Sequence, residues 1–512
     1  MEENNKRIAK NTLYLYIRML VITALSFITT RVVLDKLGAS DYGINTLVAG
    51  FVSMFAVINS ILSTGTRRFL ALYMGKEEHN KLKLTFSTAL VIHLIIAVLV
   101  VIILESFGLW FFNSNLNIPA NRMDAANWVF QFAVISVFFS ITQTPYMAAV
   151  TAHERFNIYA IMSIYDVIAK LAVLYILVVL PGDKLIIYSA LQLIVIFSGM
   201  VIYHIYCVRE FKECKLSVNV DKPLLKEMLQ FSGWGTLGHV VTVVNSQGVA
   251  IILNIFFSTV MNAARGLAST VNIAIAQFIA GFLTAAQPQL VKYYGAGDMQ
   301  RFTKLIFNVT QYTLFLMALI AVPAILEIDY VIGLWLGDSI PEYTCSFVKI
   351  TLFCGIIYRS NNMVENGLMA IGRVRELNMY SVPVYLLSLP FVYFVLWMGW
   401  GANAAYWIGS IPPLISFIIN VCLLSKFTEF PGRRYFIQVF FKNFVFIIAG
   451  AIFPFIVQQQ MQPSLTRFLV VCTLSVTCTF GIIWFFGLNE DTRHLFKQKV
   501  LGKVIKKYRG EN

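Results

Sequence analysis

Residues 84–112 read LTFSTALVIHLIIAVLVVIILESFGLWFF, an apolar run with one acidic residue and no Lys or Arg. A helix rises about 1.5 Å per residue, so roughly twenty such residues cross a hydrocarbon core about 30 Å thick. Comparable windows lie at 11–34, 42–66, 124–150, 158–180, 185–208, 228–254, 258–290, 304–332, 343–371, 378–398, 404–425, 438–457 and 465–487. The pattern predicts an all-α integral membrane protein with about fourteen transmembrane helices.

The composition favours the same class of protein. Of the 512 residues, 58% are hydrophobic and 13% are charged, whereas a soluble domain carries about twice that charged fraction. The first apolar window, 11–34, is too long for a cleaved signal peptide and has no small-residue cleavage site, so we expect an uncleaved first span. The seven cysteines show no CxxC pattern and no metal-ligand spacing. We therefore expect no disulfide framework, no metal site and no cofactor.

Lys and Arg are distributed unequally between the predicted loops. With the N-terminus inside, 30 of the 40 lie in cytoplasmic segments, five, among them Arg467, in outer segments and five within the spans. Basic residues collect in cytoplasmic loops, so the distribution predicts cytoplasmic termini and an even number of spans. The same rule accounts for the net charge of +14 without a nucleic-acid partner.

Two pairs of short segments indicate an internal repeat. Tyr73–Gly75 is echoed by Tyr293–Gly295 at an offset of 220, and Met147–Tyr159 is echoed by Leu368–Tyr380 at an offset of 221. The repeating unit is six predicted spans long. Because six is even, both copies enter the membrane from the same side, so their pseudo-axis runs along the membrane normal.

The repeat predicts a two-lobed transporter with a central cavity between the lobes. The expected parts are an N-terminal six-helix lobe at 1–226, a C-terminal six-helix lobe at 227–426, and a final part at 427–512 with helices 13 and 14 and a basic cytoplasmic tail.

Polar residues within the spans concentrate in a few helices, chiefly the second, seventh and eighth; Asn245 and Asn272 are among them. Polar side chains at this depth mark a protein-lined or hydrated interior, so we expect these helices to line the cavity. Small polar residues also join helices to one another, and either role fits Asn245 or Asn272.

Arg359 is the most informative charge, because it lies near the middle of the tenth span. A charge at that depth costs about 2.5–3.5 kcal/mol on insertion scales. Asn362 and Glu365 follow it, and Glu365 is close enough in sequence to be its ion-pair partner. The alternatives are a functional cation and a purely structural pair.

Other interior charges have simpler alternatives. Arg18 and Arg265 lie nearer the ends of their spans, where a long side chain can reach the interface. Arg67 and Arg68, at the inner end of the second span, either enforce topology or lie where an anionic headgroup would enter. Asp166 and Lys170 are four residues apart on one helix face, so we expect them to neutralise each other. The balance leaves the interior net positive, which favours anions such as phosphates.

Several segments resemble those of a known family. They are Asn262–Ala268, Gln287–Gln289, Lys292–Tyr294, Leu37–Gly43 and Arg68–Ala71. Together with the span count and the repeat, they are similar to Wzx-type polysaccharide flippases of the multidrug/oligosaccharidyl-lipid/polysaccharide exporter superfamily. The motifs mark the family better than the substrate.

The resemblance implies a carrier that moves an undecaprenyl-pyrophosphate-linked oligosaccharide from the cytoplasmic to the periplasmic leaflet by alternating access. It also implies that cavity arginines bind the pyrophosphate and that helices 13 and 14 form a groove for the polyprenyl tail. By position, Arg18, Arg265 and Arg359 are the candidates, and only Arg265 lies inside a matching motif.

We therefore predict a flippase of the bacterial inner membrane that serves surface polysaccharide (O-antigen, lipopolysaccharide) synthesis and carries no catalytic residues. The cavity set is Arg265, Arg359, Arg18, Arg67 and Arg68, with Glu365, Asn362, Asn245, Asn272, Asp166 and Lys170 as further polar or coupling residues. Its expected partners are the lipid-linked oligosaccharide and membrane lipids, with family contacts to a polymerase or glycosyltransferases. The alternatives are a multidrug exporter, whose cavity should be acidic, and a glycan polymerase or ligase, which usually needs a large outer loop.

Overall fold

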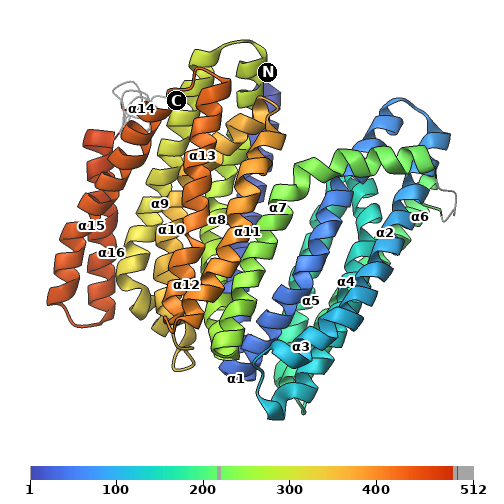
Figure 1. The fold of residues 1–512 in the computed structure, drawn as a ribbon, viewed down its shortest axis with the longest axis horizontal. Coiled ribbons are helices and arrows are strands. Elements are labelled where there is room, and N and C mark those ends of the chain that lie inside the picture. The colour runs from blue at the N-terminus through green and yellow to red at the C-terminus, as the bar shows by residue number, and fades with distance from the viewer. Residues whose placement is uncertain (1, 154, 216–220, 488–492, 494–512) are drawn as a thin grey trace, which may run out of the picture. The chain divides into compact units, whose positions relative to one another are not determined.

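The computed structural model describes residues 2–153, 155–215, 221–487 and 493, and within these ranges every regular element is a helix (Figure 1). The all-helical prediction is confirmed. In chain order the helices are α1 (Glu2–Gly75), α2 (His79–Ile103), η1 (Leu104–Gly108), α3 (Leu109–Asn115), η2 (Ala120–Arg122), α4 (Met123–Ala152), α5 (Phe156–Val179), α6 (Lys184–Glu210), η3 (Lys212–Cys214), α7 (Lys222–Phe256), α8 (Thr259–Gly295), α9 (Met299–Leu336), α10 (Thr344–Ala370), α11 (Val374–Trp397), α12 (Ala402–Gly409), α13 (Ile411–Phe427), α14 (Gly432–Tyr435), η4 (Phe436–Phe441), α15 (Lys442–Gln460), α16 (Leu465–Ile482) and η5 (Ile483–Gly487).

Each predicted span falls on one helix or on a run of consecutive helices, as 84–112 does on α2, η1 and α3. Within the described residues, nine helical segments are long and apolar enough to cross a membrane. The expected spans outside those nine lie on α1, α7, α8 and α10, which carry most of the predicted polar interior residues. The chain is a multi-pass membrane protein, and the count of fourteen stays a prediction.

α1 combines the first two expected spans, because helical backbone resumes immediately after a bend at Gly38. Its φ of 77° and ψ of 167° lie in a region that glycine adopts readily and other residues rarely do. A second bend interrupts α9 at Glu327, four residues after Pro323. A proline removes the hydrogen bond from its own nitrogen to the carbonyl four residues earlier, so Pro323 weakens the turn before it and does not by itself account for the bend at Glu327.

The chain divides into two compact units. Unit 1 comprises Met1–Val271, Leu336–Phe347 and Val374–Ser416, and unit 2 comprises Asn272–Trp335, Val348–Arg373 and Phe417–Asn512. The lobe boundaries that the repeat predicts stay a prediction.

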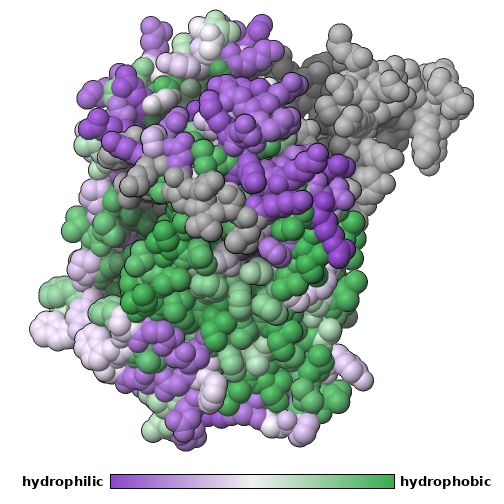
Figure 2. Space-filling view, turned by 90° about the vertical axis from the view of Figure 1, so that its right-hand side faces the viewer, coloured by the Kyte–Doolittle hydropathy of each residue, from purple (hydrophilic) through white to green (hydrophobic). Residues whose placement is uncertain are grey.

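In unit 1, α4 packs against α1, α2 and α6. The aromatic rings of Phe51, Phe112 and Phe130 are buried in the core between these helices. Ile95, Val98 and Ile102 of α2 point outward and are exposed. Figure 2 shows that hydrophobic residues form a broad middle band on one face of the molecule, with hydrophilic residues above it. This distribution suits a surface surrounded by lipid acyl chains.

In unit 2, α15 and α16 form an antiparallel hairpin, visible in Figure 1. The segment that enters this hairpin is fastened by Tyr435, whose fully buried hydroxyl donates to Ser360 O at 2.7 Å and also hydrogen-bonds the hydroxyl of Thr310 at 3.0 Å. One tyrosine thus ties the start of the hairpin to α9 and α10.

Candidate functional site

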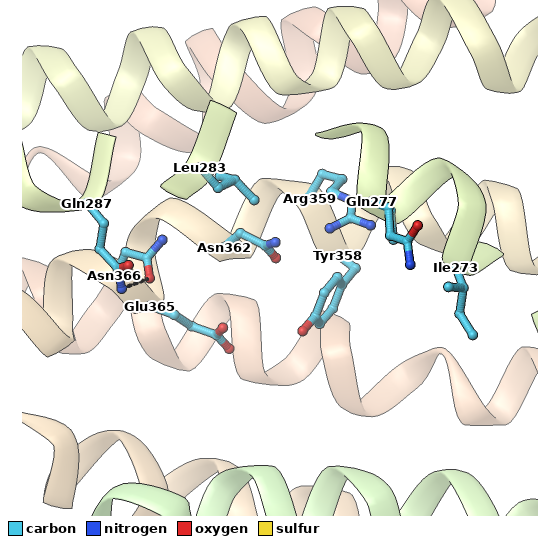
Figure 3. Close-up of a pocket in the computed structure, with 10 residues that line it drawn as sticks. Ile273, Gln277, Leu283, Gln287, Tyr358, Arg359, Asn362, Glu365 and Asn366 are labelled. Carbon is cyan, nitrogen blue, oxygen red and sulfur yellow. Dashed lines mark hydrogen bonds between the residues drawn. The ribbon is translucent and has the colours of Figure 1, made fainter. Parts of the chain in front are cut away.

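A cavity of about 460 Å³ lies within unit 2, between α8 and α10 (Figure 3). Most of its α10 residues repeat at helical spacing, which places them on one face of that helix. Its lining consists of Ile273, Ala276, Gln277, Leu283, Gln287, Tyr358, Arg359, Asn362, Glu365 and Asn366. Three predicted site residues, Arg359, Asn362 and Glu365, therefore line one cavity.

Arg359 is buried, with 8% of its surface exposed, and its guanidinium forms no ion pair with any carboxylate among the described residues. The Asn362 amide, oriented to satisfy its hydrogen bonds, donates to Tyr358 O at 2.9 Å and accepts from Arg359 Nη1 at 3.3 Å. Arg359 Nε has no partner. A buried cation without a counter-charge is costly unless an anion compensates it, so Arg359 is a candidate anion-binding group.

Glu365 does not pair with Arg359, so the structure does not show the ion pair that was one of the two alternatives from sequence. It accepts a hydrogen bond from Asn361 Nδ2 at 2.7 Å, and Asn361 Oδ1 accepts in turn from Asn420 Nδ2 at 3.1 Å. Residues six apart on an α-helix are separated by about 120° around its axis, so the two side chains diverge. Figure 3 shows the Arg359 guanidinium and the Glu365 carboxylate pointing in different directions.

Amide side chains complete the polar part of the cavity. Gln287 Nε2 donates to Asn366 Oδ1 at 3.3 Å. Gln277, like Gln287, comes from α8 and lines the cavity with the α10 residues (Figure 3). Amides present both donors and acceptors, so this lining suits a ligand that combines an anionic group with hydroxyl groups.

Arg265 lies in unit 1 and does not line this cavity. Its Nη2 donates to the backbone oxygen and to Oγ of Ser246 at 2.5 and 2.9 Å, and its guanidinium carbon lies 5.9 Å from the centre of the Tyr406 ring. The hydrogen bonds hold α8 against α7. Both hydrogen bonds come from the same nitrogen of the Arg265 guanidinium. The Arg265 side chain is half-buried.

The two predicted asparagines differ in their surroundings. Asn245 is buried, and its Nδ2 donates to Tyr385 O at 2.6 Å and to Ser388 Oγ at 2.5 Å, so it joins α7 to α11. Asn272 lies on α8 directly before Ile273 but is not part of the cavity lining.

Asp166 and Lys170 form the expected ion pair on α5, with Lys170 Nζ 2.7 Å from Asp166 Oδ2. Asp166 also lines a separate cavity of about 330 Å³ in unit 1, together with Gln143 and Tyr165. That cavity is distinct from the one that contains Arg359.

The remaining predicted arginines lie on α1. Arg67 and Arg68 are exposed near its C-terminal end, and the Arg68 guanidinium carbon is 5.7 Å from the centre of the Phe69 ring. The Arg18 side chain lies outside the described part of the structure.

Two of the family-like segments meet at one interface in unit 1. A Cβ at Gly43 would lie 1.8 Å from Thr259 O, so α1 and the start of α8 approach backbone to backbone. Thr46 Oγ1 donates to Asn262 O at 3.2 Å, and a Cβ at Gly266 would lie 2.9 Å from Thr46 Cγ2. Small residues allow this close contact between membrane helices, so these motifs serve helix packing.

One charged pair was missed from the sequence. Glu327 is fully buried on α9 and accepts from Arg467 Nη2 of α16 at 2.9 Å, although the sequence places Arg467 in an outer segment. The only local signal is an acidic residue inside an apolar window, and nothing in the sequence indicates its partner.

Solved structures define the class of fold. The inward-facing conformation of a multidrug resistance MATE family transporter of the MOP superfamily matches with a TM-score of 0.66 at 13% identity, over 80% of this chain and 97% of that one. Lipid II flippase MurJ, in an inward closed conformation, matches with a TM-score of 0.66 at 12% identity, over 93% and 98%. A MOP superfamily transporter from Pyrococcus furiosus, described as having a binding pocket of reverse polarity, matches with a TM-score of 0.55 at 13% identity, over 80% and 92%. The chain has the fold of the MOP superfamily of transporters.

The sequence then identifies the family. Residues 8–294, more than half of the chain, match the family model described as polysaccharide biosynthesis protein. The chain belongs to this polysaccharide biosynthesis protein family. None of the curated proteins matches the chain. The resemblance seen in the sequence motifs is confirmed for the family and the fold.

Proposed function

We propose that this chain is a flippase that moves an undecaprenyl-pyrophosphate-linked oligosaccharide from the cytoplasmic to the periplasmic leaflet of the bacterial inner membrane. It acts as a transporter and not as an enzyme, with both termini in the cytoplasm. The headgroup crosses through a polar interior by alternating access of the two predicted lobes, while the polyprenyl chain stays in lipid. The transported intermediate supplies surface polysaccharide synthesis.

One observation carries this proposal: Arg359 is a buried cation in a polar cavity, and no carboxylate of the described chain pairs with it. A planar guanidinium binds phosphate oxygens through two parallel hydrogen bonds. A pyrophosphate would supply the charge that Arg359 lacks, and the nearby amides of Gln277 and Asn362 could bind further oxygens.

Among the described residues, the other predicted cations do not line the cavity that contains Arg359, and we assign them separate roles. Arg67 and Arg68 are exposed near the predicted cytoplasmic end of α1, where they would meet the anionic headgroup first. Arg18 and Arg265 are further candidates for binding the pyrophosphate. Asp166 and Lys170 neutralise each other and contribute no net charge.

A multidrug exporter is the second candidate, and the observation that favours it is Glu365 in the same cavity. A cationic drug would bind this carboxylate and would be repelled by Arg359. The two functions therefore make opposite predictions: removal of Arg359 lowers the flipping of an anionic headgroup but improves the export of a cation.

The experiment uses a strain that lacks the gene and accumulates the lipid-linked intermediate on the cytoplasmic leaflet. We expect the wild-type chain to clear this intermediate, Arg359→Lys to do so partly, and Arg359→Gln to lower clearance at least about tenfold, as for loss of one charge-assisted contact. The measured quantity is the fraction of intermediate that is accessible from the periplasm.

Arg301→Gln is the matched control, because it removes one positive charge from an exposed arginine of unit 2 outside the cavity. It should restore clearance fully. An unchanged lipid-linked intermediate and surface glycan in the deletion strain, with altered drug resistance instead, would contradict the proposal and favour the exporter.

A further inference from the structure

We propose that unit 2 contains a second anion site, which binds the phosphate-bearing headgroup of an anionic membrane lipid. The site is a cavity of about 840 Å³ between the first turns of α9 and residues 429–442, which include α14 and η4. Lys304 comes from α9, and Arg434 and Lys442 come from the other wall. None of these residues lines the cavity that contains Arg359.

The positive charge of this cavity exceeds the negative charge of its lining. Across the described residues, Lys304, Arg434 and Lys442 form no ion pair: Arg434 Nε donates to Gln438 Oε1 at 2.9 Å, and Lys442 Nζ lies 5.4 Å from the centre of the Phe446 ring. Glu429 is the one acidic residue of the lining. Cations that converge from segments far apart in the sequence repel one another, and a bound anion relieves this repulsion.

The helices that form the cavity walls are fastened to one another, so the backbone positions of the three cations are set before any ligand arrives. Tyr435 hydrogen-bonds Thr310 and thereby fastens α14 to α9. Gln311 Nε2 donates to Gly487 O at 2.7 Å, which links the base of the cavity to the end of η5. η4 is a π-helix, a departure from α-helical geometry that is frequent at functional sites.

Its position in the fold points to a lipid as the source of the anion. The two walls are the first turns of the apolar segments Met299–Leu336 and Gly432–Gln460, both of which are candidate membrane spans. The ends of such spans lie at the level of lipid headgroups, where basic pockets between helices bind anionic lipids. The volume exceeds the need of a free phosphate ion, and Phe307 and Val439 add apolar surface for the glycerol and upper acyl groups.

The test measures the Tm of the purified full-length chain in detergent during titration with dioleoyl phosphatidylglycerol, dioleoyl phosphatidylcholine or inorganic phosphate. The variant is Lys304→Gln/Arg434→Gln/Lys442→Gln. Its control, Lys292→Gln/Lys426→Gln/Arg433→Gln, removes the same charge from exposed residues of unit 2 outside the cavity lining. We expect phosphatidylglycerol to raise the Tm of the wild type and of the control, with an apparent affinity at least about tenfold weaker in the variant.

Three results would overturn the proposal: equal stabilisation of variant and control by phosphatidylglycerol, equal stabilisation by phosphatidylcholine, or stabilisation by phosphate alone that matches phosphatidylglycerol. If the triple variant does not fold, native mass spectrometry of Lys442→Gln should show fewer phosphatidylglycerol adducts than that of Lys426→Gln. Arg359→Gln should keep the response to phosphatidylglycerol, so this site and the proposed flippase function succeed or fail separately.

Discussion

Arg467 and Glu327 form an ion pair between segments 140 residues apart, with Arg467 Nη2 2.9 Å from Glu327 Oε2. The Glu327 side chain is fully buried, and that of Arg467 is 11% exposed. The pair connects the α15–α16 hairpin to the bend of α9. Gln458 of α15 donates to Leu326 O beside it, so two contacts hold the hairpin at this point.

Removing one partner of a buried ion pair should lower the free energy of unfolding strongly, whereas replacing both partners by apolar residues should change it little. We expect Glu327→Leu alone or Arg467→Leu alone to lower the free energy of unfolding by about 3–5 kcal/mol, because each leaves one buried charge without a partner. The double variant should recover most of that loss. Unfolding of the purified chain in detergent, arranged as a double-mutant cycle, measures the coupling. If the double variant lost as much free energy of unfolding as the two single variants together, the two side chains would not stabilise each other, which would contradict the prediction.

The contact between Gly43 and Thr259 predicts a steric effect in unit 1. Gly43→Ala would place a methyl group 1.8 Å from a backbone oxygen, which cannot move as a flexible side chain can. We expect a loss of at least about 3 kcal/mol or failure to fold, the upper range for overpacking. Size-exclusion profiles and the Tm of purified protein measure this.

Gly75→Ala is the matched control for that substitution. It lies at the end of the same helix, and its added methyl group meets no atom within 4 Å. Its stability should stay within about 0.5 kcal/mol of the wild type. Equal losses in both variants would mean that the close approach of α1 to α8 does not limit stability.

The sequence predicts the membrane class well, because hydropathy and the distribution of Lys and Arg are local properties. It also places Arg359, Asn362 and Glu365 within two turns of one span, and in the structure all three line one cavity. It does not predict which groups they bond. Glu365 accepts a hydrogen bond from Asn361 and not from Arg359, because residues four apart lie on the same side of a helix whereas residues six apart do not.

Contacts between distant segments could not be predicted in the same way. The pair of Glu327 with Arg467 joins α9 to α16, and no periodicity in one helix indicates a partner in another. Gly43 and Gly266 could be noticed in their motifs, but their role in close helix contact depends on three-dimensional positions. For the same reason, the convergence of Lys304 with Arg434 becomes visible only in the fold.

Asp183 and Arg122 predict a pH dependence of stability at the loop before α6. Arg122 Nη1 donates to Asp183 Oδ2 at 2.6 Å and holds the pKa of that carboxyl below its usual value. A carboxyl of this kind stabilises the fold above its unfolded pKa of about 4, and the contribution is lost as the pH falls through the lower folded value. The pKa of Asp41, which shares this arginine, lies above its usual value because burial outweighs the arginine.

Asp183→Asn separates the charge of this residue from its role as helix cap. Asp183 accepts from Leu185 N at 3.0 Å and Ile186 N at 3.3 Å, and asparagine caps helices about as well as aspartate. We expect Asp183→Asn to flatten the fall in Tm between about pH 5 and pH 3, while Asp183→Ala should cost about 1 kcal/mol more at neutral pH. Identical pH profiles for Asp183→Asn and the wild type would show that the ion pair does not set this dependence.

Arg359 predicts a conflict between stability and transport. Its buried guanidinium has an unpartnered Nε and no carboxylate partner among the described residues, so the empty protein bears the cost of an uncompensated charge. We expect Arg359→Met, which keeps much of the side-chain length, to leave the Tm unchanged or to raise it by a few degrees. The same variant should clear the lipid-linked intermediate at least about tenfold less than the wild type. Tm in detergent and clearance in the deletion strain are measured on one variant. If Arg359→Met lowers both together, the arginine supports the fold, and if it lowers neither, the anion is bound elsewhere.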